Sequence, residues 1–231
     1  MRLALLDPYI PHQPFPSVDL ALKNPDGLLA VGGCLSVERL LNAYRLGIFP
    51  WFNPDEPILW WSPNPRLVLF PEQLYVSRSL KKTIRKNLFR VSFDTAFSEV
   101  LDGCASPRPD ALGTWLSPEM QHAYIELHRL GYAHSIETWC DDELVGGLYG
   151  VALGQVFFGE SMFHIQTDAS KVAFVYLVEH LMDWGYQLVD CKVHTSHLAS
   201  LGAKDISRHE FSKLLENYCK LPVSDKAWRQ V

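Results

Sequence analysis

An alternation of strand and helix patterns in the C-terminal half constrains the fold most strongly. Residues 155–163 are apolar and aromatic, as in a buried strand. Residues 168–184 predict a long apolar helix that ends at Gly185, and residues 187–193 predict a second strand. This order is typical of a βαβ unit with a right-handed crossover and parallel strands. The chain is therefore expected to have an α/β (α+β) fold.

Two carboxylates stand within these strands. Glu160 and Asp190 would approach one another if the strands are neighbours, near the strand ends where α/β sheets build their sites. Strand alternation would place Lys192 beside Asp190, where it could neutralise the carboxylate. Two acids that converge in apolar surroundings favour a functional site. A purely structural ion pair for Glu160 is the alternative, because a buried carboxylate needs a partner.

The preceding strand, residues 143–153, carries Gly146, Gly147 and Gly150. Glycines in a strand allow close approach by a backbone or a ligand, although they also occur at simple bulges. The strand would pair with residues 133–139 through a turn at Asp141 and Asp142.

The first 62 residues differ from the rest of the chain, because eight prolines limit regular structure there. One helix is expected from the N-cap Ser36 to a stop at Gly47. Dense aromatic residues follow it, and such residues are usually core. Tyr44 and Trp51 could also stack on a nucleobase. We expect a small N-terminal domain over residues 1–62 and a larger domain over residues 63–231.

The charge is unevenly distributed. The net charge is −5, which by itself argues against a nucleic-acid-binding protein. However, the segment between Glu72 and Asp94 carries +6 and the rest of the chain −11. A helix over residues 78–88, with Leu80, Ile84 and Leu88 buried, would display this charge; it would either steer an anionic partner or simply be solvated. The basic residues are Arg78, Lys81, Lys82, Arg85, Lys86 and Arg90.

Other signals exclude several classes. No apolar run is long enough to span a membrane, and the N-terminal residues lack the charged-then-apolar pattern of a signal peptide. The five cysteines include no CxxC pair. We therefore expect a cytoplasmic protein with reduced thiols. Cys191, His194 and His197 have metal-like spacing, but a zinc site lacks a fourth ligand and a Cys–His nucleophile pair lacks an orienting acid. We expect no metal and no cofactor.

Several motifs together resemble the leucyl/phenylalanyl-tRNA–protein transferase family over nearly the whole chain. They are PDGLLAVGG (25–33), GIFPWF (47–52), WWSP (60–63), GTW (113–115), AHSIE (133–137), LVGGLYG (144–150), FGESMF (158–163), DC (190–191) and SLGA (200–203). The resemblance implies a small N-terminal domain and an acetyltransferase-like (GNAT) domain with a mixed central sheet. It also implies transfer of Leu, Phe or Met from aminoacyl-tRNA to proteins with N-terminal Arg or Lys, which marks them for degradation. The chain is expected to be a monomer and not to bind a membrane.

The resemblance also implies roles for individual residues. Glu160 and Asp190 match the acidic centre, and Lys192 stands where the family usually has a proton-accepting Gln. Cys34 replaces an Asp that usually follows the Gly-Gly pair. The remaining matches are Trp115, Leu148, Phe157 and Met162 for the amino-acid side-chain pocket. With a tRNA as substrate, we expect Tyr44, Trp51 and Ser161 to lie at its 3′ end. We expect the basic residues Arg78, Lys81, Lys82, Arg85 and Lys86 to contact its phosphates.

Two other functions compete with this hypothesis. An acyl-CoA-dependent GNAT N-acetyltransferase would share the fold, but it needs a glycine-rich pyrophosphate loop, and residues 164–167 contain no glycine. A non-catalytic tRNA-binding module would keep the basic helix without needing the paired acids.

Overall fold

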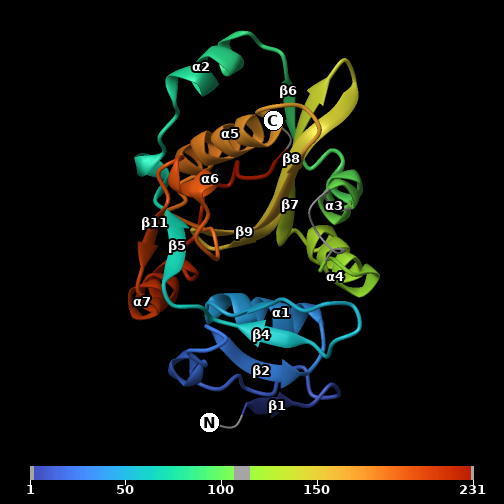
Figure 1. Cartoon of the computed structure of the whole chain (residues 1–231), viewed down its shortest axis with the longest axis vertical. Helices are drawn as coiled ribbons and strands as arrows, with labels where there is room; N and C mark the ends of the chain where they lie inside the picture. The colour runs from blue at the N-terminus through green and yellow to red at the C-terminus, as the bar shows by residue number, and fades with distance from the viewer. Residues whose placement is uncertain (1–2, 107–114, 230–231) are drawn as a thin grey trace.

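The structure is a computed structural model that describes residues 3–106 and 115–229. Two sheets organise it (Figure 1). The smaller sheet has the order β1-β2-β4-β3, in which only β1 and β2 are parallel. Its strands are β1 (Ala4–Leu6), β2 (Leu28–Gly32), β3 (Phe49–Pro50) and β4 (Leu59–Trp61).

The larger sheet has seven strands in the order β11-β5-β10-β9-β8-β7-β6. Only β9 and β10 pair in parallel, so the sheet is mixed. The strands are β5 (Arg66–Leu69), β6 (Arg90–Phe93), β7 (Ala133–Cys140), β8 (Glu143–Leu153), β9 (Val156–His164), β10 (Leu188–Asp190) and β11 (Lys204–Ile206). The predicted mixed α/β fold is confirmed.

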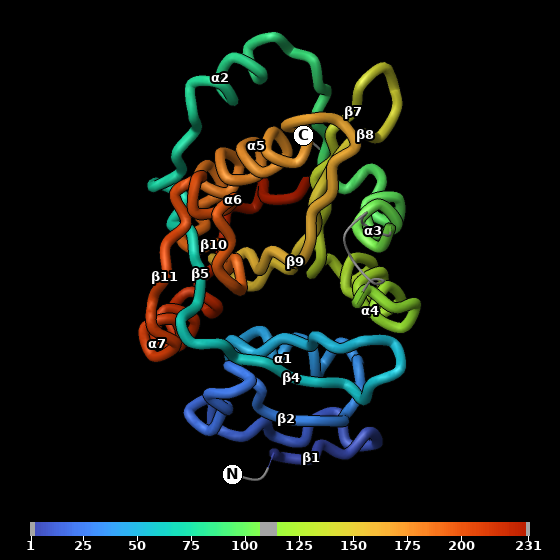
Figure 2. Tube along the Cα trace, viewed as in Figure 1, coloured from blue at the N-terminus to red at the C-terminus, as the bar shows by residue number. Residues whose placement is uncertain are grey.

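Helices cover both faces of the large sheet (Figures 1 and 2). Helix α5 packs against one face, α3 and α4 lie on the other, and α1 lies between the small sheet and the large one. The helices are η1 (Val18–Leu20), α1 (Val37–Arg45), η2 (Pro71–Gln73), α2 (Arg78–Arg85), α3 (Phe97–Ala105), α4 (Pro118–Arg129), α5 (Ala169–Asp183), α6 (Ser196–Ala199) and α7 (Arg208–Tyr218).

One apolar cluster joins the two sheets. It includes Leu29 and Trp60 from the small sheet, Leu40 from α1, Tyr124 from α4 and Phe158 from β9. The small sheet ends at Trp61 and the large one begins at Arg66, but the burial of these side chains is shared between them. The two parts are therefore held together by their cores as well as by the chain.

Several local expectations are confirmed. Ser36 accepts a hydrogen bond from the Arg39 N–H as the N-cap of α1. Ser117 has the same role at the start of α4, where it accepts from the Met120 N–H. Asp141 and Asp142 have φ of 48° and 65°, the left-handed conformation that suits the two-residue turn between β7 and β8. Strand β10 pairs in parallel with β9, and Asp190 lies opposite Phe158.

Three local expectations are wrong. Helix α2 ends at Arg85 and leaves Leu88 54% exposed, so Leu88 does not extend the buried stripe. Asp94 precedes the apolar pattern of Phe97, Val100 and Leu101, which favours it as a helix N-cap, but it does not cap α3. It has φ of 54°, and its carboxylate accepts from the Ser135 N–H. The predicted strand 187–193 is only Leu188–Asp190, because the chain turns sharply after it.

Over residues 3–106 and 115–229, none of the helices combines the length and hydropathy that a bilayer crossing requires.

Candidate active site

A β-bulge places Glu160. Tyr149 of β8 lies opposite Ser161, whereas the next residue, Gly150, lies opposite Gly159. Glu160 is therefore an extra residue in β9, and such a bulge changes the direction of side chains. The alternation shifts by one residue across it. Odd-numbered Phe157 belongs to the apolar cluster around α5 before the bulge, and even-numbered Met162 packs against that cluster after it.

Gly150 is required beside this bulge. A Cβ there would lie 2.3 Å from the Phe158 carbonyl oxygen and 2.6 Å from the Phe157 ring. No side chain fits at such distances, so the glycine allows β9 to approach β8 closely. The sequence pattern of small residues therefore reflects close backbone packing at this position.

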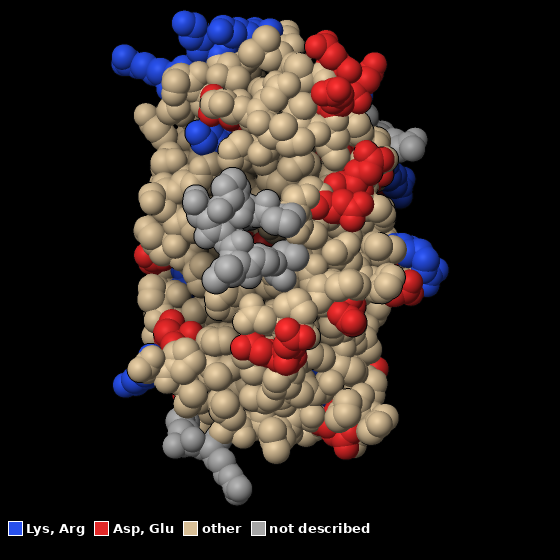
Figure 3. Space-filling model, turned by 45° about the vertical axis from the view of Figure 1, so that its right-hand side comes forward, with Lys and Arg blue, Asp and Glu red and all other residues tan. Residues whose placement is uncertain are grey.

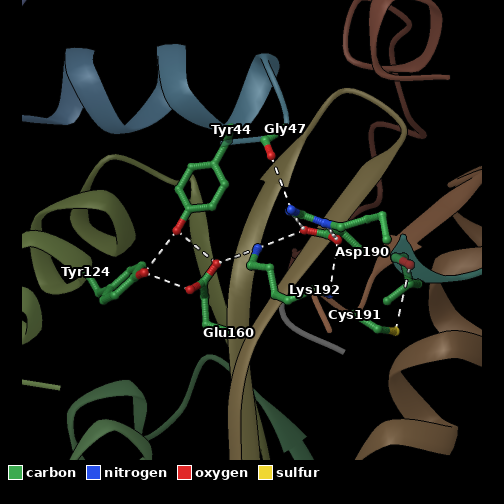
Figure 4. A network of polar contacts seen from close by, with 9 residues as sticks. Tyr44, Gly47, Tyr124, Glu160, Asp190, Cys191 and Lys192 are labelled. Carbon is green, nitrogen blue, oxygen red and sulfur yellow. Dashed lines mark hydrogen bonds and ion pairs between the residues drawn. The ribbon is translucent and has the colours of Figure 1, made fainter. Parts of the chain in front are cut away.

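The carboxylate of Glu160 is nearly enclosed and fully partnered. Its side chain is 2% exposed. The hydroxyl of Tyr44 donates to Oε1 at 2.9 Å, and that of Tyr124 donates to Oε2 at 2.7 Å (Figure 4). Burial and the nearby Glu160 charge raise the pKa of Tyr44 and of Tyr124 well above the usual range. Both tyrosines are therefore protonated donors at neutral pH.

Asp190 is held by a bidentate ion pair. Its carboxylate is completely buried, and Arg66 donates from Nε to Oδ1 at 2.7 Å and from Nη2 to Oδ2 at 2.8 Å. Burial disfavours the charged form, but Arg66 and Lys192 outweigh it and hold the pKa of Asp190 well below its usual range. Asp190 therefore stays ionised at any pH at which the protein would be assayed.

Lys192 joins the two acids. Its ammonium lies 3.0 Å from Oε1 of Glu160 and 2.8 Å from Oδ2 of Asp190 (Figure 4). The expected proximity of Lys192 to Asp190 is confirmed, although strand alternation is not its cause. Lys192 lies beyond β10 with φ of 65°, and its N–H donates to Oδ1 of Asp190 at 3.1 Å. The buried cluster therefore contains two cations, Arg66 and Lys192, and two anions.

Sequence reasoning did not identify Arg66 or Tyr124. Arg66 is the first residue of an otherwise apolar strand and is 1% exposed. A charged residue in such a strand needs a partner, and this was the sequence signal that could have identified it. Tyr124 gives no such signal, since a tyrosine on the buried side of α4 is ordinary core.

The residues expected near the tRNA 3′ end take different positions. Tyr44 is completely buried and offers no open ring face, so the stacking expected for it is not available in this conformation. Trp51 is 51% exposed and packs edge-on against Trp61, with ring centroids 5.6 Å apart. Ser161 is half-buried in β9, opposite Tyr149.

The four expected pocket residues do not all join one cluster. Leu148 and Met162 are cross-strand neighbours, and with Phe157 they pack in the cluster around α5. Trp115 packs instead against the cluster that joins the two sheets. Gly113 and Thr114, which precede it in the motif, lie outside the described residues.

The basic residues of α2 are exposed at one end of the molecule. Figure 3 shows Lys and Arg side chains gathered there, whereas acidic groups are spread over the rest of the visible face. Thr83 ties the helix to the start of α5 through a hydrogen bond of 3.1 Å to Asp168. The exposed basic members of α2 and its C-cap are Arg78, Lys81, Lys82, Arg85 and Lys86.

A separate cleft of about 660 Å³ lies between loops that flank the strands of the small sheet and the first turns of α4. Its walls are apolar apart from two residues of α4. They are formed by Leu35, Phe52, Pro54, Ile58, Glu119, His122 and Ala123. Across the described ranges, no three His, Cys, Asp or Glu side chains gather closely enough to hold a metal ion.

Comparisons with solved structures give only partial overlaps. The structure of L-PGS from Bacillus licheniformis overlaps with a TM-score of 0.40 at 11% identity, covering 71% of this chain and 55% of that chain. A GCN5-related N-acetyltransferase from Kribbella flavida gives a TM-score of 0.39 at 10% identity, covering 72% of this chain and 60% of that chain.

Sequence comparisons are far closer. The leucyl/phenylalanyl-tRNA protein transferase family matches residues 68–216, and the N-terminal domain of the same family matches residues 33–64. The leucyl/phenylalanyl-tRNA–protein transferase of Methylococcus capsulatus is 57% identical, covering 98% of this chain and 97% of the relative. The Nitrosomonas europaea protein of the same name is 57% identical, covering 93% and 91%. The chain therefore belongs to the leucyl/phenylalanyl-tRNA–protein transferase family.

Proposed function

We propose that the chain transfers Leu, Phe or Met from aminoacyl-tRNA to the N-terminal Arg or Lys of an acceptor protein and so creates a degradation signal. The family assignment supports aminoacyl transfer from tRNA to protein. One observation supports the mechanism most directly: the buried carboxylates of Glu160 and Asp190 flank the ammonium of Lys192. Such a pair suits an acceptor that arrives as a cation.

Direct aminolysis needs little covalent chemistry from the protein. An aminoacyl ester is already activated, and an α-amine with a pKa of about 7.7–8.0 is partly neutral near pH 7. The protein must hold amine and ester in line and stabilise developing charge. The depressed pKa of Asp190 makes its carboxylate a weak base, which favours orienting the amine over accepting its proton. Glu160 would hold the acceptor or place the ester.

Recognition of the donor would be divided between two surfaces. The apolar side chains of Leu148, Phe157 and Met162 would select by size and lack of polarity, with Trp115 as a further wall. One methylene is worth only about 1–3 kcal/mol, so tolerance among Leu, Phe and Met is expected. The exposed basic face of α2 would hold tRNA phosphates without reading sequence.

An acyl-CoA-dependent acetyltransferase fits the structure less well. A pyrophosphate would be bound by free N–H groups at the start of the helix that follows β9. Here the carboxylate of Asp168 stands at the start of α5, where it accepts from Lys171 at 3.0 Å and from Thr83 at 3.1 Å. A negative side chain at this position opposes a bound diphosphate.

The cellular setting follows from the same proposal. We infer that the chain acts as a monomer in the cytoplasm without a membrane. All five cysteines are free thiols, as expected in a reducing compartment.

A transfer assay tests the function. Phe-tRNA and a peptide that begins with Arg should yield the Phe-extended peptide, whereas an N-acetylated peptide and acetyl-CoA as donor should yield nothing. Asp190→Asn should lose transfer but retain tRNA binding. Asp205→Asn, which changes an exposed carboxylate paired with His194, should retain both. Phe-tRNA binding without any product would indicate a tRNA-binding module, and acetylation of the peptide would indicate an acetyltransferase.

A further inference from the structure

The ammonium of Lys192 occupies an enclosed site of defined chemistry. Carboxylate oxygens of Glu160 and Asp190 flank it at 3.0 and 2.8 Å. The rings of Tyr44, Phe49 and Phe158 surround it, with centroids 5.1, 5.2 and 5.4 Å from Nζ. The Lys192 side chain is 10% exposed. Carboxylates supply charge-assisted hydrogen bonds and aromatic faces attract a cation, so the site matches a primary ammonium.

The walls of this site are held by groups other than Lys192. Asp190 is fixed by two hydrogen bonds from Arg66, and Glu160 is fixed by the hydroxyls of Tyr44 and Tyr124. The site should therefore keep its shape when the Lys192 ammonium leaves. Its negative charge would then be only partly balanced by Arg66, which increases its attraction for another cation.

We propose that this is a displaceable primary-ammonium site, which Lys192 fills in the free protein and which the α-ammonium of the acceptor takes when it binds. The inference rests on the proposed function for the identity of the acceptor. Because Lys192 is tethered, it competes as an intramolecular ligand at high effective concentration. Lys192 would therefore weaken acceptor binding and shield the two carboxylates until an acceptor arrives.

A binding experiment tests the site without any transfer reaction. Full-length Lys192→Ala protein is heated with ethylammonium chloride, with sodium chloride at equal ionic strength as the reference. Ethylammonium should raise the Tm of Lys192→Ala and leave the wild type unchanged. Lys171→Ala, which removes a surface lysine paired with Asp168 at 3.0 Å, should behave like the wild type. Equal responses of all three proteins, or no response from any of them, would overturn the proposed site.

A second variant covers the case in which Lys192→Ala does not fold. The side chain of Lys192→Met fills the space of the lysine stem but ends one atom short of the ammonium, so NH₄⁺ is the matching probe. We expect NH₄⁺ to raise the Tm of this variant more than Na⁺ does. Equal effects of the two ions would contradict the proposal.

Kinetics tests displacement by the acceptor. With an Arg-starting peptide, Lys192→Gln should lower KM about tenfold, which corresponds to about 1.4 kcal/mol, and change kcat less than KM. An unchanged or higher KM would refute the competition. Ethylammonium binding to Lys192→Ala without any peptide transfer by the wild type would instead keep the ammonium site and reject the proposed function.

Discussion

Replacement of Arg66 by Met tests how the buried charges stabilise the fold. The change removes two hydrogen bonds to Asp190 and one of 3.2 Å from Nη1 to the Gly47 carbonyl oxygen. It retains an apolar stem between the rings of Phe49 and Phe211, which lie 4.8 and 4.7 Å from the guanidinium carbon. The loss should therefore come mainly from the charge rather than from packing.

The expected magnitude follows from the burial of both partners. Removing one member of a buried ion pair typically costs about 3–5 kcal/mol, because the other charge stays buried without its partner. Lys192 cannot fully replace Arg66, since its ammonium is shared with Glu160. We expect Arg66→Met to lose stability in this range. Adding Asp190→Leu should recover much of it, because an apolar pair of similar volume is often neutral.

Urea unfolding of the wild type, both single variants and the double variant measures the coupling. The native pKa of Asp190 is depressed, so its stabilisation is complete above the unfolded pKa of about 3.9 and is lost as the pH falls below it. The unfolded carboxyl is the same in wild type and Arg66→Met, so the difference in their stability should be largest at pH 7. It should narrow as the pH falls to the point where Asp190 of the native variant, which lacks Arg66, takes up a proton. A loss of stability under about 1 kcal/mol at pH 7 for Arg66→Met would refute the reasoning. So would single-variant losses of unfolding free energy that simply add up in the double variant.

Three further predictions concern the proposed tRNA face and the bulge. Replacing Lys81 and Lys82 by Gln should reduce the slope of log K for tRNA binding against log salt concentration by about one per lysine. Lys213→Gln, which changes another exposed lysine, is the control. An unchanged slope would exclude α2 as the phosphate site. Trp51→Ala should weaken binding of the tRNA 3′ end by about 1–3 kcal/mol if a base stacks on the exposed part of the ring. Equal affinity in a filter-binding assay would reject stacking. Gly150→Ala should lower the free energy of unfolding in urea by about 1–3 kcal/mol or more, because its Cβ would meet the Phe158 carbonyl oxygen at 2.3 Å. A variant as stable as the wild type would contradict the described bulge.

Local features were readable from the sequence. Apolar patterns and end signals predicted α1 and α5, and the turn residues Asp141 and Asp142 predicted the hairpin of β7 and β8. These features depend on residues close together in the chain. The βαβ order also predicted that Glu160 and Asp190 would approach each other, since parallel neighbours bring equivalent strand ends together. The motifs led to the family that the sequence comparisons confirm.

The partners of the two acids were decided only by tertiary structure. Arg66 is 124 positions from Asp190, and Tyr44 is 116 positions from Glu160, so no local pattern relates them. The bulge at Glu160 depends on the register between β8 and β9, which changes which face each side chain occupies. Sequence alone determined that the buried charges need partners, because desolvation is costly for any carboxylate. Only the packing of separate elements determined which groups meet that need, because complementary charges must reach one enclosed place together.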